Sequence, residues 1–195
     1  MKPARIHITG PSGAGSTTLG HALADRLDYP VHDSDDYYWL PTSPPYRLPR
    51  PAEERAGLFA EMVGTRADWI FTGSLMGWGD RFVPLLDLVV FLYVPAECRL
   101  MRLRQRETAH FGDDAVAPGG WRHEETEDFL EWASHYDDGT RDGRNLENQR
   151  AWLANLPCPV LELQGTLPRA ELVEAVVGRL EMLQDRLAEW PRQPS

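Results

Sequence analysis

The stretch "HITGPSGAGSTTLGHALADRL", residues 7–27, decides the fold. It joins a short apolar segment, residues 4–9, to a segment with apolar side chains at helical spacing, residues 16–27. This pattern predicts a strand, a glycine-rich turn and a helix. Such a turn aims backbone N–H groups at phosphate oxygens, and the positive end of the helix dipole lies beside them. The stretch therefore predicts a phosphate-binding loop over residues 10–18.

Most residues of this loop have a physical reason to contact a nucleotide. Glycines let the backbone approach phosphate closely, and Thr17 stands where a hydroxyl would ligate Mg²⁺. The alternative is a plain glycine-rich turn, which explains less because three glycines reduce stability with no structural benefit. The residues predicted to hold the nucleotide are Gly10, Ser12, Gly13, Ala14, Gly15, Ser16, Thr17 and Thr18.

One position departs from the full G-x4-G-K-[ST] pattern, because Ser16 stands in place of the lysine. That lysine reaches the β- and γ-phosphates and neutralises charge during transfer. Its loss matters more for catalysis than for binding. Two interpretations stay open: a protein that binds nucleotide without transferring phosphate, or an enzyme that takes its cation from elsewhere in the chain.

Arginines near the long connection over residues 104–157 could supply that cation. In the predicted helix 95–107, two arginines lie four residues apart and share one face. A guanidinium suits phosphate oxygens, although a solvated basic face is the alternative for each residue. The predicted catalytic arginines are Arg102, Arg106 and Arg141, with Arg99 on the same helical face, Arg104 pointing elsewhere and Arg144 as a further candidate.

An acidic cluster follows the second predicted strand in "VHDSDDYYW", residues 31–39. Asp33, Asp35 and Asp36 would lie at the carboxyl end of a strand, where open α/β sheets place their ligands. Carboxylates there can hold Mg²⁺ or accept a proton from an attacking hydroxyl. The alternative is a solvated acidic turn.

These two motifs, "GPSGAGSTT" and "DSDDYY", carry a family resemblance. The chain resembles the nucleoside monophosphate kinase and shikimate kinase group of P-loop phosphotransferases, including adenylate-kinase-related and topology-modulation proteins. "DSD" is similar to the D-x-D of shikimate and gluconate kinases, and "DDYY" to a motif of uridine and nicotinamide riboside kinases. The resemblance implies that Asp35 is catalytic at the acceptor and that Asp33, also catalytic, binds Mg²⁺ with Thr17. Some archaeal cytidylate kinases have a similar loop without lysine and are kinases nonetheless.

The order of elements predicts an α/β protein. Strands are expected at residues 4–9, 30–36, 68–74, 86–94 and 158–164, and helices at 16–27, 51–66, 95–107 and 168–190. The resemblance implies a P-loop three-layer α/β/α fold with a five-stranded parallel sheet in the order 2-3-1-4-5. We expect one domain over residues 1–195, with the connection 104–157 as a lid or inserted subdomain.

The segment "TGSLMGWGDRF", residues 72–82, predicts a further wall of the site. Its glycines allow close backbone approach, and Trp78 could stack on a base or sugar. Arg47, Arg50 and Arg81 could meet an anionic acceptor, although each alone is more often a surface residue.

The composition of the chain argues against some classes of binding partner. The formal net charge of −10 argues against coating nucleic acid or an anionic membrane. Two cysteines without CxxC spacing and the absence of a secretory signal favour a cytoplasmic protein. We expect a monomer or a homodimer. We expect an ATP-dependent phosphotransferase that uses Mg²⁺ and ATP, or another nucleoside triphosphate, and a nucleotide, nucleoside, small polyol or acid as acceptor. The alternative is a nucleotide-binding pseudo-kinase or regulatory protein.

Overall fold

The computed structural model describes residues 2–43, 45–140 and 143–189. Five parallel strands form one sheet in the order β2-β3-β1-β4-β5, which confirms the expected fold class. The strands are β1 (Arg5–Thr9), β2 (Val31–Asp33), β3 (Trp69–Thr72), β4 (Leu88–Tyr93) and β5 (Val160–Gln164). Their carboxyl ends meet at one edge, so the loop after β1 and the acids after β2 lie at the same edge of the sheet.

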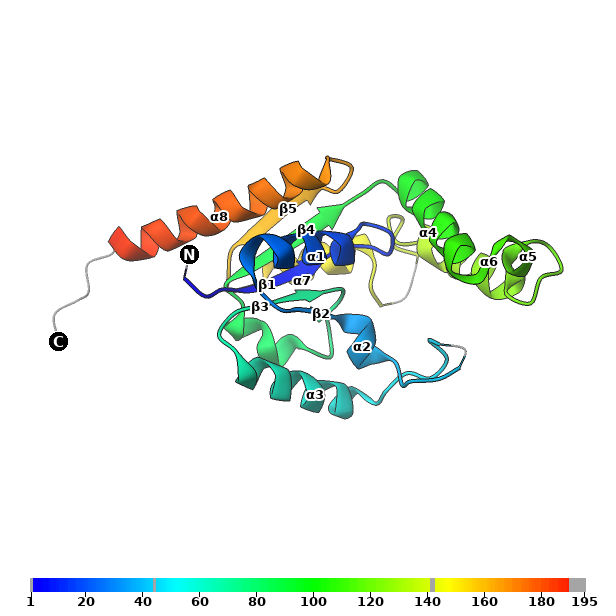
Figure 1. Cartoon of the computed structure of the whole chain (residues 1–195), viewed down its shortest axis with the longest axis horizontal. Coiled ribbons are helices and arrows are strands. Elements are labelled where there is room, and N and C mark those ends of the chain that lie inside the picture. Colours follow the sequence, from blue (N-terminus) through cyan, green and yellow to red (C-terminus); the bar gives the residue numbers. More distant parts are fainter. Residues whose placement is uncertain (1, 44, 141–142, 190–195) are drawn as a thin grey trace.

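Helices cover both faces of the sheet (Figure 1). One face packs against α1 (Ser16–Leu27) and α8 (Arg169–Glu189), where Ile6 and Ile8 are fully buried. The other packs against α3 (Ala52–Thr65), α7 (Leu146–Ala154) and the short η1 (Asp80–Leu85), where Phe59 and Phe71 are fully buried. The alternation along β1 therefore sends apolar side chains to one face and the polar His7 and Thr9 to the other.

The chain between β4 and β5 forms α4 (Ala96–Phe111), α5 (Asp113–Val116), α6 (His123–Ser134) and α7. In Figure 1, α4, α5 and α6 project beyond the sheet. Helix α4 continues past the predicted end at residue 107 and stops before Gly112. Gly112 has a φ of 91°, a backbone conformation that residues with a side chain rarely adopt. Leu103 packs against Leu130 and Ala133 and so joins α4 to α6.

Arg99 is a structural residue of this region. Its side chain is fully buried. It donates to the carbonyl oxygens of Val94 (2.9 Å) and Ala133 (3.3 Å) and forms an ion pair with Asp137. A solvated basic face is therefore the wrong description for Arg99, because its guanidinium ties α4 to the end of α6.

The acidic segment after β2 differs from the sequence-based expectation. A strand was expected over residues 30–36, but β2 ends at Asp33 and a helix, α2 (Ser34–Tyr38), begins at once. Asp33 is the N-cap of this helix, because its Oδ1 accepts from the backbone N–H of Asp35 at 3.0 Å. Gly73 permits the close fit, since a Cβ at that position would lie 1.9 Å from the Ser34 hydroxyl.

None of the described helices combines the length and the apolar character that crossing a membrane would require.

His7 is a titratable group inside the core. It is fully buried, and its Nδ1 lies 3.1 Å from the carbonyl oxygen of Phe71. Burial lowers the pKa of His7 from 6.5 to about 4, and the charge of Arg144 acts in the same direction. The folded protein therefore holds this imidazole neutral.

This buried imidazole predicts a pH-dependent stability. Between pH 6.5 and about 4 the unfolded chain binds a proton at His7 that the folded protein does not, so the free energy of unfolding should fall as the pH drops. A pKa shift of this size changes the free energy of unfolding by about 3 kcal/mol. His7→Gln should lose this dependence in urea unfolding across that interval, whereas His21→Gln on the exposed surface of α1 should keep it. Equal pH dependence of wild type and His7→Gln would contradict the assignment.

Candidate functional site

The glycine-rich loop connects β1 to α1 with little room for side chains. Gly13 and Gly15 have φ angles of +83° and +97°, which favour glycine. A Cβ at Gly10 would lie 2.4 Å from the carbonyl oxygen of Leu92. Ala14 donates its backbone N–H to the carbonyl oxygen of Pro11 at 3.0 Å, which closes the turn. The loop thus has the tight, glycine-dependent geometry of an anion-binding turn at a helix N-terminus.

Asp33 joins the loop to the acidic cluster. Its Oδ2 accepts from the hydroxyls of Thr17 at 2.7 Å and Thr72 at 2.8 Å. The structure therefore brings together Thr17 and Asp33, the two predicted Mg²⁺ ligands. One hydroxyl and one carboxylate suit Mg²⁺, which takes oxygen ligands and keeps several waters or phosphate oxygens. Among the described residues no three His, Cys, Asp or Glu side chains gather as a metal site, so bound water and phosphate would have to complete the shell.

Asp35 lies two residues after Asp33, in the first turn of α2. The residue is exposed, but the surrounding protein removes part of the water from its carboxyl group, and this desolvation raises its pKa. The negative charge of Asp33 acts in the same direction. The charges of Arg106 and Arg144 oppose that rise. Asp35 is thus a carboxyl whose pKa is affected by two arginines from the segment between β4 and β5.

The predicted catalytic arginines occupy different places. Arg102 donates to the carbonyl oxygens of Gly13 (3.4 Å), Ala14 (3.5 Å) and Gly165 (3.1 Å). Because the loop would bind phosphate through its N–H groups, these carbonyl contacts give Arg102 a role in bracing the loop. Arg141 lies outside the described residues, so its predicted role stays a prediction.

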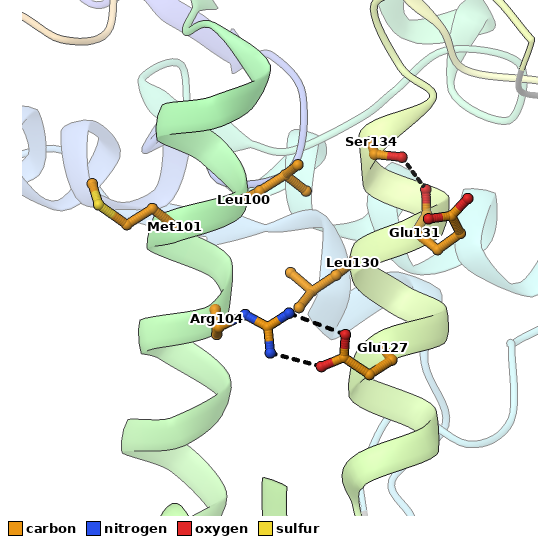
Figure 2. A pocket seen from close by; sticks show the side chains of 7 residues that line it. All are labelled: Leu100, Met101, Arg104, Glu127, Leu130, Glu131 and Ser134. Atoms are coloured by element: carbon orange, nitrogen blue, oxygen red, sulfur yellow. Dashed lines mark hydrogen bonds and ion pairs between the residues drawn. The ribbon is translucent and has the colours of Figure 1, made fainter. Parts of the chain in front are cut away.

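The other arginines of α4 have carboxylate partners. Arg106 donates to Glu107 at 3.4 Å, and its guanidinium lies 5.6 Å from the Phe129 ring centroid. Figure 2 shows Arg104 turned toward Glu127, which it binds at 2.6 and 3.0 Å, beside a hollow of about 300 Å³ between α4 and α6. None of the loop residues 10–18 lines this hollow, so it is separate from the candidate site.

The arginines considered for an anionic acceptor are also engaged. Arg47 pairs with Glu125 of α6, Arg50 donates to the carbonyl oxygen of Tyr37 at 3.1 Å, and Arg81 lies 4.0 Å from Glu53. Trp78 is half-buried and packs on Phe59, while its Nε1 donates to Ser74 at 2.8 Å.

Sequence reasoning missed Arg55 of α3. Its guanidinium lies 4.4 Å from the Tyr38 ring centroid and 5.8 Å from that of Trp78, and its buried Nε has no hydrogen-bond partner in the described structure. The signal was weak, because a single arginine in an amphipathic helix is ordinarily a surface residue.

Sequence reasoning also missed Thr9 and Gln149. Both are fully buried, and the Gln149 amide donates to the Thr9 hydroxyl at 3.0 Å across 140 positions of sequence. Thr9 directly precedes the loop, whereas Gln149 lies in the first turns of α7. No local pattern could have paired them.

The geometry of Gly10 predicts a matched pair of stability effects. Gly10→Ala should destabilise the protein by about 1–3 kcal/mol, because the new methyl group would collide with the backbone at Leu92. Gly57→Ala should stabilise it by about 0.5–1 kcal/mol, because that exposed position in α3 has open space and alanine favours a helix. Denaturant unfolding of the two variants measures both effects. Equal effects of the same sign would mean that the loop tolerates a side chain at Gly10.

Comparison with known proteins gives one close sequence relative. The chain is 40% identical over 175 residues to the uncharacterized protein YqaC of Bacillus subtilis, a match that covers 90% of this chain and 96% of that protein. No protein-family model matches the chain.

Solved structures share the fold at low sequence identity. A gluconokinase from Sinorhizobium meliloti has a TM-score of 0.56 at 18% identity, covering 95% of this chain and 96% of that one. A shikimate kinase from Acinetobacter baumannii in complex with shikimate has a TM-score of 0.53 at 17% identity, covering 93% and 94%. A deoxyadenosine kinase from M. mycoides with bound dATP has a TM-score of 0.53 at 13% identity, covering 91% and 99%. The fold is thus that of small P-loop kinases.

Proposed function

The chain belongs to the family of Bacillus subtilis YqaC and has the fold of small P-loop kinases, and from these two facts we propose that it transfers the γ-phosphate of ATP, or of another nucleoside triphosphate, to a small-molecule acceptor. The observation that carries the proposal is the hydrogen bond from Thr17 of the loop to Asp33. It unites the phosphate-binding turn, a Mg²⁺-type oxygen pair and the acid Asp35 at one edge of the sheet.

Each part then has a role. The loop, residues 10–18, cradles the phosphates through backbone N–H groups. Thr17 and Asp33 would hold Mg²⁺, which would supply positive charge to the phosphates. The acceptor hydroxyl attacks the γ-phosphorus, Asp35 takes its proton, and the bond to the β–γ bridging oxygen breaks to release ADP. Desolvation by the surrounding protein raises the pKa of Asp35. Its carboxylate is therefore a stronger base than a fully solvated one.

The segment 104–157 acts in this proposal as a lid on a single domain. Helix α6 already contacts the proline-rich chain that follows α2, because Glu125 of α6 forms an ion pair with Arg47 of that chain. A segment that closes there would exclude water, which otherwise competes with the acceptor for the phosphoryl group. A nucleotide, nucleoside, small polyol or acid would fit the mixture of acids, arginines and aromatic rings around Asp35.

A second candidate function is nucleotide binding without transfer, and Ser16 favours it. The loop lysine is absent, so the charge that develops in the transition state lacks its usual partner. Ser16→Lys separates the two candidates. A pseudo-kinase should gain nucleotide affinity or hydrolysis, whereas an enzyme that takes its cation from elsewhere should gain little or lose turnover.

The primary test is ligand binding followed by transfer. Saturating ATP with Mg²⁺ should raise the unfolding temperature, and omission of Mg²⁺ should reduce that rise. Transfer of γ-phosphate is then screened against nucleosides, nucleoside monophosphates, polyols and sugar acids. No protection by any nucleoside triphosphate with Mg²⁺ would refute the proposal at its first step.

Asp35 gives the sharper prediction. Asp35→Asn should retain the ATP-dependent stabilisation but lose transfer by about 10²–10⁴-fold, the contribution of a general base. Asp36→Asn is the matched control, because it removes a neighbouring exposed carboxylate of α2 and should keep transfer within a small factor. Equal losses in both variants would show that the cluster acts only through its total charge.

A further inference from the structure

We propose, on the basis of the phosphotransferase function above, that Arg144 supplies the positive charge missing at Ser16 and that Gln149 positions it. Arg144 precedes α7, and Gln149 lies in the first turns of that helix.

Arg144 differs from the arginines of α4 in its contacts with the described part of the chain. Within residues 2–43, 45–140 and 143–189, it forms no hydrogen bond or ion pair, whereas Arg99, Arg102 and Arg104 are all engaged. Its side chain is half-buried, and burial lowers its pKa. A partly desolvated cation without a partner is costly, and an arriving anion would remove that cost. The site is therefore prepared for a negatively charged ligand.

The chain that follows Arg144 is fixed by hydrogen bonds. Asn145 caps α7, since its Oδ1 accepts from the N–H of Asn148 at 2.8 Å. The N–H of Leu146 donates to the carbonyl oxygen of Tyr136 at 2.8 Å. Arg144 is thus held where α7 begins, next to the chain that leaves α6.

Gln149 connects this place to the phosphate-binding loop. Its amide donates to the Thr9 hydroxyl at 3.0 Å and accepts from the Tyr136 hydroxyl at 3.2 Å, and all three side chains are fully buried. Thr9 immediately precedes Gly10. One buried amide therefore ties the start of the loop to the segment that carries Arg144.

Electrostatic effects agree with this placement. The charge of Arg144 lowers the pKa of Asp35, at the acceptor side of the proposed site, and that of His7, three residues before the loop. In the proposal this guanidinium acts where charge develops on a transferring phosphoryl group.

The first test compares Arg144→Met with Arg150→Met. Arg150 is the matched control, because it lies on α7, is exposed and pairs with Glu162 at 3.2 Å. Arg144→Met should lower affinity for ATP with Mg²⁺ by about tenfold or more while affinity for AMP stays unchanged. Without nucleotide it should unfold at the same temperature as wild type or higher, because an unpaired charge is gone. Arg150→Met should match wild type with both nucleotides.

The second test measures turnover with the best acceptor from the screen. Arg144→Met should lower turnover by about 10²-fold or more, as when one transition-state electrostatic group is removed. Gln149→Met should also lower turnover, but the double variant should be no slower than Arg144→Met alone, because Gln149 acts through Arg144. Losses that multiply would mean that Gln149 is merely structural and would overturn its role.

The outcomes separate this inference from the function on which it rests. Absence of ATP binding or transfer by the wild-type protein refutes the phosphotransferase proposal and this inference with it. Wild-type transfer with an unchanged Arg144→Met variant refutes only the role of Arg144. An equal loss of ATP and AMP affinity would also overturn it, because Arg144 would then not act on the terminal phosphates.

Discussion

The carboxylate of Asp33 accepts three hydrogen bonds, and the arrangement of the candidate site depends on them. Thr17 donates from α1, Thr72 from the end of β3, and the N–H of Asp35 from α2. The loop, the central part of the sheet and the acidic helix are therefore held in register by one side chain.

This constraint also places Asp35. As the N-cap, Asp33 starts α2 at the point where β2 ends, so the next acid sits on the first turn of a short helix instead of continuing a strand. The charges of Arg106 and Arg144, from the segment between β4 and β5, lower the pKa of this second carboxyl and oppose the rise caused by burial. The two carboxylates consequently occupy different environments although only one residue separates them.

A loop without lysine changes how charge can be supplied to a phosphate. A lysine on α1 would belong to the same element as the loop, whereas an arginine from the chain after α6 must be brought there by tertiary contacts. The buried amide of Gln149 and the cap at Asn145 provide such contacts.

The sequence alone determined the strands, the glycine-rich loop and the position of the acidic cluster after the second strand. Apolar periodicity and glycine spacing are local, so residues 7–27 and the short apolar runs predicted the elements, and the parallel order followed from the family resemblance. The roles of the arginines needed the tertiary structure. Arg99, Arg102 and Arg144 look alike in sequence, yet one is buried in an ion pair, one braces the loop and one has no partner among the described residues. Burial and partner choice are set by residues up to 140 positions away, as for Gln149 and Thr9, and such contacts leave no local pattern.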